Sequence, residues 1–186
     1  MFVKRFPNRE ALEAARSVEG LFDYCTAKDP GAPIEKLFWD PIRNGTLTAH
    51  YQALVTAIQE RGQKVGKVPH IVFTTYHNPL PGPSESIDCL DLGDLSRDEI
   101  DYLITLEQTL GQTIQDGVGH LDGVTVADLF DVMDGHKFCT DDPWTYGLSI
   151  LLLDTESQAP FHPTPAGQEA IAALVEAAIP SSLEVQ

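Results

Sequence analysis

The chain has 186 residues, of which 28 are acidic and 12 basic, so its formal net charge is −16. A hydrophobic content of 42% is typical of one globular domain and excludes a disordered tail. The acidic surface repels phosphate groups, which excludes nucleic acid and anionic lipid as expected partners, and no apolar run approaches the roughly 18–20 residues that span a membrane.

The first predicted elements are a helix and a buried strand. Residues 46–61 carry apolar side chains at helical spacing, and Gly62 follows as the predicted end of this helix. The helical positions are Leu47, Tyr51, Leu54, Val55 and Ile58. Residues 68–76 are rich in β-branched and aromatic side chains and predict a strand, which the proline-rich residues 78–83 end in a loop.

A second helix and a second strand follow. Ser96 and Glu99 have the spacing of a capping box, so a helix is predicted to begin there. Its apolar stripe consists of Ile100, Leu103, Ile104, Leu110, Ile114 and Val118. Gly123 then introduces a predicted strand over residues 124–130.

The last predicted helix follows a long irregular stretch, residues 131–160. Thr164 is its predicted N-cap, Pro165 occupies its first position, and Pro180 ends it. Helix, strand, helix, strand and helix thus alternate, and crossovers of helical length favour a parallel α/β sheet covered by helices. Two clear strands, with at most a third in the N-terminal region, are few for a free-standing sheet, which indicates that part of it is missing.

His162 is the residue that the sequence singles out for chemistry. It lies two residues before the predicted N-cap of the last helix, in the loop that follows the second strand. Functional groups of open α/β sheets collect at such strand ends, and an imidazole suits the deprotonation of a serine hydroxyl. On local chemistry alone, the alternative is a histidine that merely bonds to the backbone where a helix begins.

Four sequence blocks resemble one enzyme family. Residues 161–167, Phe-His-Pro-Thr-Pro-Ala-Gly, are similar to the His-Pro-x-x-x-Gly block that closes SGNH hydrolases, the GDSL lipase and esterase family. The strand that runs into residues 76–81 resembles the Tyr-Pro-x-Leu-x-Pro segment of secreted actinobacterial members. Residues 128–130, Asp-Leu-Phe, and after them residues 134–139, Asp-Gly-His-Lys-Phe-Cys, resemble the two parts of their Phe-x-Gly-His-x-x-Cys loop, and Trp144 follows shortly after. The blocks come in the family's order and cover about residues 46–179.

The resemblance implies a three-layer α/β/α, flavodoxin-like fold with a parallel sheet. Residues 1–186 would form a single, partial SGNH hydrolase domain, with a divergent N-terminal region (1–45) and a family-like core (46–180). The implied activity is hydrolysis of small-molecule or lipid esters by a secreted serine esterase that needs no cofactor, with His162 as general base. Asn78 and Trp144 are implied substrate contacts, although packing is the more common role of a loop tryptophan.

The chain departs from the family where the nucleophile should be. It contains neither the Gly-Asp-Ser block that supplies the serine nor the Gly-x-Asn-Asp block that supplies an oxyanion-hole asparagine. A truncated or inactive chain, whose N-terminal strands and nucleophile lie upstream, is therefore expected. Most members have an aspartate three residues before the histidine, whereas this chain has Ala159. Its main-chain carbonyl is the implied group that orients His162, as in some secreted members.

The cysteines leave two interpretations open. Cys25, Cys89 and Cys139 contain no CxxC pair, so by themselves they are three free thiols or one disulfide and one free cysteine. The resemblance implies a Cys89–Cys139 disulfide, which would stabilise by about 4 kcal/mol in the chain-entropy estimate and form in an oxidising compartment. No signal peptide is visible, so secretion is expected from the resemblance alone.

The main alternative to an enzyme is a non-catalytic binding protein that has kept the pocket of an SGNH scaffold. Loss of the nucleophile block fits this class as well as it fits truncation. A metal site is not predicted, because the six histidines show no HxH or HxxxH spacing.

Overall fold

The computed structural model describes residues 35–85, 97–146 and 161–181. In chain order these residues form η1 (Glu35–Trp39, a π-helical turn), α3 (Asp40–Arg43), α4 (Thr46–Lys64), β1 (Ile71–Thr74), α5 (Arg97–Val118), β2 (Val124–Ala127) and α6 (Pro165–Ala177). The helical segment Glu35–Arg43 has no counterpart among the predicted elements. Ser96, the first residue of the predicted capping box, lies outside the described residues, so that capping box stays a prediction.

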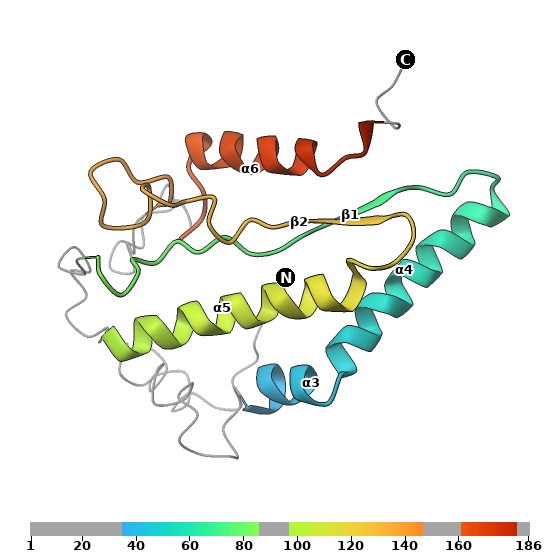
Figure 1. Cartoon of the computed structure of the whole chain (residues 1–186), viewed down its shortest axis with the longest axis horizontal. Helices are drawn as coiled ribbons and strands as arrows, with labels where there is room; N and C mark the ends of the chain where they lie inside the picture. The colour runs from blue at the N-terminus through green and yellow to red at the C-terminus, as the bar shows by residue number, and fades with distance from the viewer. Residues whose placement is uncertain (1–34, 86–96, 147–160, 182–186) are drawn as a thin grey trace, which may run out of the picture.

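The two strands pair in parallel, with Ile71 opposite Val124 and Thr74 opposite Ala127. Figure 1 shows α6 on one side of the strands and α4 and α5 on the other. The described chain is therefore layered helix, sheet, helix, and the predicted parallel α/β arrangement is confirmed at this level.

The core lies between the sheet and the α4–α5 pair. Its buried members are Val55, Ile114, Val118 and Val124. These residues belong to α4, α5 and β2. They meet because the apolar stripes of the two helices face the side of the sheet to which alternate residues of β2 point. Burial of one such aliphatic side chain contributes about 1.5–3 kcal/mol, so these contacts hold the three elements together.

The predicted end of α4 at Gly62 is wrong, because the helix continues to Lys64. A Cβ at Gly62 would lie 2.7 Å from Cδ of Pro69 and 2.8 Å from the Lys67 carbonyl oxygen. Position 62 therefore requires glycine, because residues 67–69 fold back against the helix at this point. The left-handed residue that follows the helix is Gly66, with φ 75°.

Both strands are shorter than the predicted residues 68–76 and 124–130, since each has four residues. The hydrogen bond from Thr75 N to the Ala127 carbonyl still continues the ladder at 3.1 Å. Beyond it, Asp128 Oδ1 accepts from Phe130 N at 3.1 Å and turns the chain away from extended geometry.

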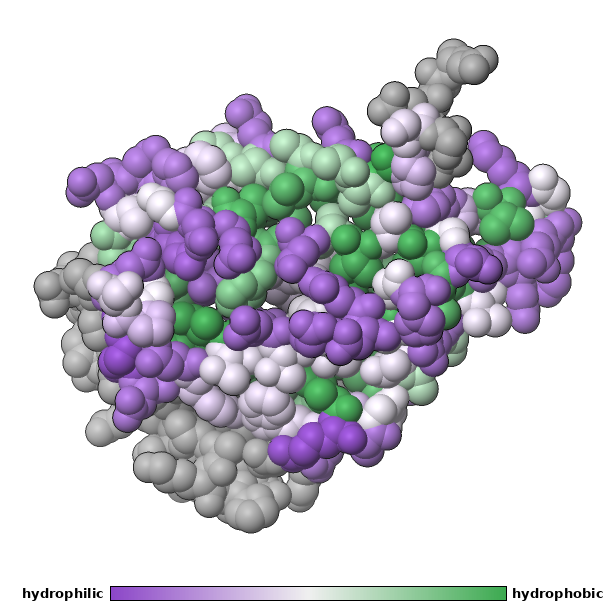
Figure 2. Space-filling view, viewed as in Figure 1, coloured by the Kyte–Doolittle hydropathy of each residue, from purple (hydrophilic) through white to green (hydrophobic). Residues whose placement is uncertain are grey.

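Both outer edges of the sheet lack a strand partner among the described residues. On the face in Figure 2, hydrophobic side chains are visible between α6 and α5, in the band where Figure 1 places the strands. The apolar surface of the sheet is thus incompletely covered by the described elements. None of the described helices has the length and apolarity needed to cross a membrane.

Candidate functional site

The loops that follow β1 and β2 meet at the carboxyl ends of the strands. Asn78 N donates to the Phe130 carbonyl at 3.0 Å, and Phe138 N donates to the Pro79 carbonyl at 2.8 Å. Each loop therefore supplies hydrogen-bond partners for the main chain of the other. This edge of a parallel sheet is where α/β proteins place their functional groups.

Thr75 and Asp128 join the two strand ends. The Thr75 hydroxyl donates to Asp128 Oδ1 at 2.9 Å and accepts from Leu129 N at 2.7 Å. Gln115 Nε2 donates to Asp128 Oδ2 at 2.8 Å. Burial opposes the charge on Asp128, but hydrogen bonds from Phe130 N, Thr75 and Gln115 outweigh it, so the pKa of this carboxyl is lowered. This carboxylate therefore joins the ends of the two strands.

His162 combines an exposed side chain with a restrained main chain. Residues 144–146 pair antiparallel with residues 161–164. Tyr146 N donates to the His162 carbonyl at 2.9 Å, and Phe161 N donates to the Tyr146 carbonyl at 3.0 Å. The imidazole is accessible to a reactant while its backbone is held on both sides.

The start of α6 fits closely against this pair of segments. Thr164 Oγ1 accepts from Gly167 N at 3.4 Å and Pro165 begins the helix, which confirms the predicted N-cap. Thr164 N donates to the Trp144 carbonyl at 2.8 Å. A Cβ at Gly167 would lie 2.5 Å from that same oxygen, so this position of the His-Pro-x-x-x-Gly pattern has space only for glycine.

Phe161, directly before His162, has φ 61°, a left-handed conformation that is uncommon for a bulky residue. Its ring meets the Phe138 ring edge-on, with 5.8 Å between centroids. Both rings pack against the buried Leu80 and Ile100. The unusual backbone is therefore held by a side chain anchored in a second hydrophobic cluster.

His77 lies next to His162, a neighbour that the sequence analysis missed. Its Nε2 is 3.2 Å from the Phe161 carbonyl oxygen. Burial lowers the pKa of His77, the backbone hydrogen bond to Phe161 opposes this shift, and the nearby His162 adds to it. The only available signal was the position of His77 just past a predicted strand, which says nothing about a partner 84 residues away.

Asn78 is buried, with 2% of its surface exposed. Its Oδ1 accepts a hydrogen bond from Leu80 N at 2.9 Å and so closes a turn at the start of the Pro-Leu-Pro loop. The predicted contact of Asn78 with substrate stays a prediction, which this burial does not favour.

Replacing Asn78 with alanine is expected to lower the free energy of unfolding by about 1–3 kcal/mol, because Leu80 N would be left buried without an acceptor. Asn44→Ala is the matched control. Asn44 Oδ1 makes the same bond to Thr46 N at 2.9 Å, but in an exposed turn where water replaces it. Urea denaturation of both variants measures the difference, and equal losses would contradict the assignment.

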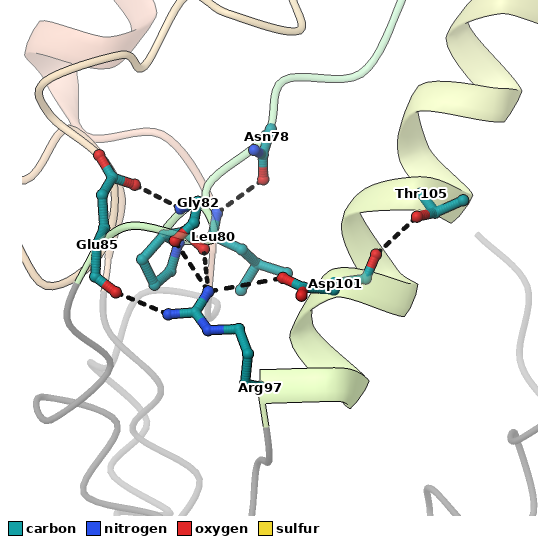
Figure 3. A network of polar contacts seen from close by, with 8 residues as sticks. Asn78, Leu80, Gly82, Glu85, Arg97, Asp101 and Thr105 are labelled. Carbon is teal, nitrogen blue, oxygen red and sulfur yellow. Dashed lines mark hydrogen bonds and ion pairs between the residues drawn. The ribbon is translucent and has the colours of Figure 1, made fainter.

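Arg97, at the start of α5, holds the other end of the same loop (Figure 3). Its guanidinium donates to the carbonyl oxygens of Pro81 at 3.0 Å, Gly82 at 2.9 Å and Glu85 at 2.7 Å. Asp101 Oδ1, one helical turn on, lies 3.7 Å from the same group. The first turn of α5 therefore fixes the loop that carries His77 and Asn78.

Trp144 stacks on His136, with 3.8 Å between ring centroids and 6° between the planes. His136 Nδ1 also lies 2.9 Å from the Asp142 carbonyl oxygen. One face of the half-buried tryptophan is therefore occupied by its own loop, in line with the packing alternative. Its predicted contact with substrate stays a prediction.

A hollow of about 520 Å³ lies beside His77, lined by residues from β1, α4 and α5. This volume is within the range of roughly 300–1,000 Å³ for small-molecule pockets. β1 uses the N–H groups of Ile71 and Thr75 for β2. By alternation, Val72 and Thr74, which line the hollow, turn their main-chain groups to the open edge.

Two predicted site residues, Ala159 and Cys89, lie outside the described residues, so the predicted carbonyl contact and the Cys89 pairing stay predictions. Cys139 is disulfide-bonded. Within the described part of the chain, no cluster of three histidine, cysteine or acidic side chains is arranged to hold a metal ion.

Comparison of the chain with family models, curated proteins and solved structures finds no match.

Proposed function

We propose that this chain is the histidine-bearing part of a serine carboxylic-ester hydrolase of the SGNH type, with His162 as its general base. The observation that carries the proposal is the combination at His162 of an exposed imidazole and a backbone held by hydrogen bonds to Tyr146. A general base must reach the reacting hydroxyl and keep one orientation. The four sequence blocks in family order support the same assignment.

In the proposed reaction a serine hydroxyl attacks the ester carbonyl, and His162 accepts its proton and delivers it to the departing alcohol. Water, activated by the same imidazole, then releases the acid. The Ala159 carbonyl is the proposed acceptor for the second ring nitrogen. The serine comes from a segment outside the described residues. The open edge of β1 and the hollow beside it offer space for such a segment.

The proposed substrate is a small-molecule or lipid ester, and the proposed compartment is extracellular. Structural disulfides persist in oxidising surroundings, and Cys89 is the proposed partner of Cys139. Peptide mapping of the unreduced protein would find a linked pair of peptides that contain these two cysteines.

Hydrolysis of p-nitrophenyl acetate by the purified chain tests the role of His162. An imidazole that is positioned as a general base contributes about 10²–10⁴-fold to such reactions, so a slow rate above buffer is expected even without a serine. His162→Ala should remove this rate, whereas His120→Ala should keep it. His120 is the matched control because it is also exposed, in the turn that follows α5.

Equal rates for the wild type and His162→Ala would contradict the proposal. If both proteins nevertheless bound a non-hydrolysable ester analogue, the alternative of a non-catalytic binding protein on the same scaffold would replace it. Fast turnover that a fluorophosphonate blocks would support the esterase and would place the nucleophile within this chain.

A further inference from the structure

Phe161, the residue before His162, is held by three separate contacts. The Phe161 N–H donates to Tyr146 at 3.0 Å, and the ring lies edge-on to Phe138. The third contact is between the Phe161 carbonyl oxygen and His77 Nε2, at 3.2 Å. Among the contacts between described residues, this last one acts on the carbonyl, the part of Phe161 that belongs to the same peptide plane as the His162 N–H.

That plane links the two histidines mechanically. Because a peptide unit is planar, a fixed Phe161 carbonyl also fixes the direction of the N–H and Cα of His162. The left-handed φ of 61° at Phe161 makes the plane costly to hold in this orientation without such contacts. Release of the carbonyl would leave the plane held only at its flanks, where Phe161 N and the His162 carbonyl bond to Tyr146. The plane could then rock, and the imidazole of His162 would lose its fixed direction.

The hydrogen bond also determines the tautomer of His77. A carbonyl oxygen only accepts, so Nε2 of His77 must carry the hydrogen. His77 is half-buried in the loop that Arg97 and Asn78 hold in place. A rigid, correctly oriented donor therefore faces the Phe161 carbonyl.

We propose that His77 is a positioning residue for His162, acting through its hydrogen bond to the Phe161 carbonyl. The inference rests on the proposed function only in its consequence for catalysis. Its structural content, that His77 orders the peptide before His162, stands apart from any activity.

A pair of amide substitutions isolates this hydrogen bond. The side-chain nitrogen of glutamine reaches about as far as Nε2 of histidine, so His77→Gln should retain the donor. Asparagine is one methylene shorter, so His77→Asn should lose it with the same chemistry. His77→Phe, which keeps a ring but has no donor, is a second variant without the bond.

The first readout is the ¹⁵N order parameter of the His162 amide. It should be near the value of about 0.85 for rigid backbone in the wild type and His77→Gln, and should fall below about 0.6 in His77→Asn and His77→Phe. The second readout is the His162-dependent hydrolysis of p-nitrophenyl acetate. There kcat should fall about tenfold in the two donor-free variants, with KM changed by less than about twofold, because misorientation affects the reacting geometry.

The outcomes separate this inference from the proposed function. Unchanged order parameters in both donor-free variants would overturn the positioning role, whatever the activity. Lowered order parameters without any His162-dependent hydrolysis in the wild type would support positioning and count against the esterase. Loss of kcat in His77→Gln as large as in His77→Asn would also overturn the role of the hydrogen bond.

Discussion

Replacing Gly167 with alanine is expected to lower the free energy of unfolding by about 3 kcal/mol. The new Cβ would lie 2.5 Å from the Trp144 carbonyl oxygen, 3.1 Å from Met133 Cε and 3.2 Å from Pro163 Cβ. The methionine can move, but the carbonyl cannot, because it accepts the hydrogen bond from Thr164 N at 2.8 Å. Alanine gains helix propensity of up to about 1 kcal/mol, which is less than the cost of the contact.

Gly111→Ala provides a control of the same chemistry. Gly111 is also buried in a helix, but its added Cβ would meet the Thr75 side chain at 3.4 Å, an ordinary contact. Without a clash, the propensity gain should leave Gly111→Ala unchanged or more stable by roughly 0.5 kcal/mol. Urea denaturation of the two variants should therefore give opposite signs. A Gly167→Ala protein as stable as the wild type would show that α6 does not pack this closely on residue 144.

Local patterns were sufficient for the element types. The stripes on α4 and α5, the β-branched runs and the cap at Thr164 each depend on neighbours within one or two turns, and the structure contains all of them. Element ends were predicted less well. The sequence suggests that Gly62 ends the helix. In the structure glycine is needed there because Pro69 packs so closely against the helix that a Cβ would clash.

Long-range contacts account for what the sequence could not supply at the site. Nothing adjacent to His77 in the sequence points to Phe161, and the left-handed conformation of Phe161 depends on Phe138 and Tyr146. Asn78 was predicted to contact substrate on the strength of its block, whereas its role in a buried turn could have been expected from its position before Pro-Leu. His162, by contrast, was selected from local sequence, namely its position before the last helix and the His-Pro-x-x-x-Gly block that contains it.

Glu107 is an acidic residue in the apolar stripe of α5. It occupies the α5 stripe between Leu103 and Leu110, each of which packs against a different hydrophobic cluster. Its Oε2 is buried and has no hydrogen-bond partner within the described structure. Burial therefore raises the pKa of Glu107 from 4.5 to about 7.

The raised pKa makes the stability of the protein depend on pH in a definite direction. Below pH 4.5 the carboxyl is neutral in the folded and the unfolded chain, and the stabilising effect of the raised pKa is fully present. It is lost as the pH rises through about 7, because folding must then bury a carboxylate. The loss between pH 4 and pH 8 should be roughly 2–3 kcal/mol, since part of the side chain keeps contact with water.

Glu107→Gln should remove this dependence, because the amide has nearly the same shape and does not ionise. The variant is expected to match the wild type near pH 4 and to exceed its free energy of unfolding by roughly 2–3 kcal/mol at pH 8. The lowered pKa values of His77 and Asp128 destabilise both proteins alike at low pH, so they cancel in the difference. Glu60→Gln, at an exposed position on α4, should change stability by less than about 0.5 kcal/mol at either pH. A Glu107→Gln protein with no advantage at pH 8 would mean that water or a polar partner reaches this carboxylate, and that the α5 stripe is open at residue 107.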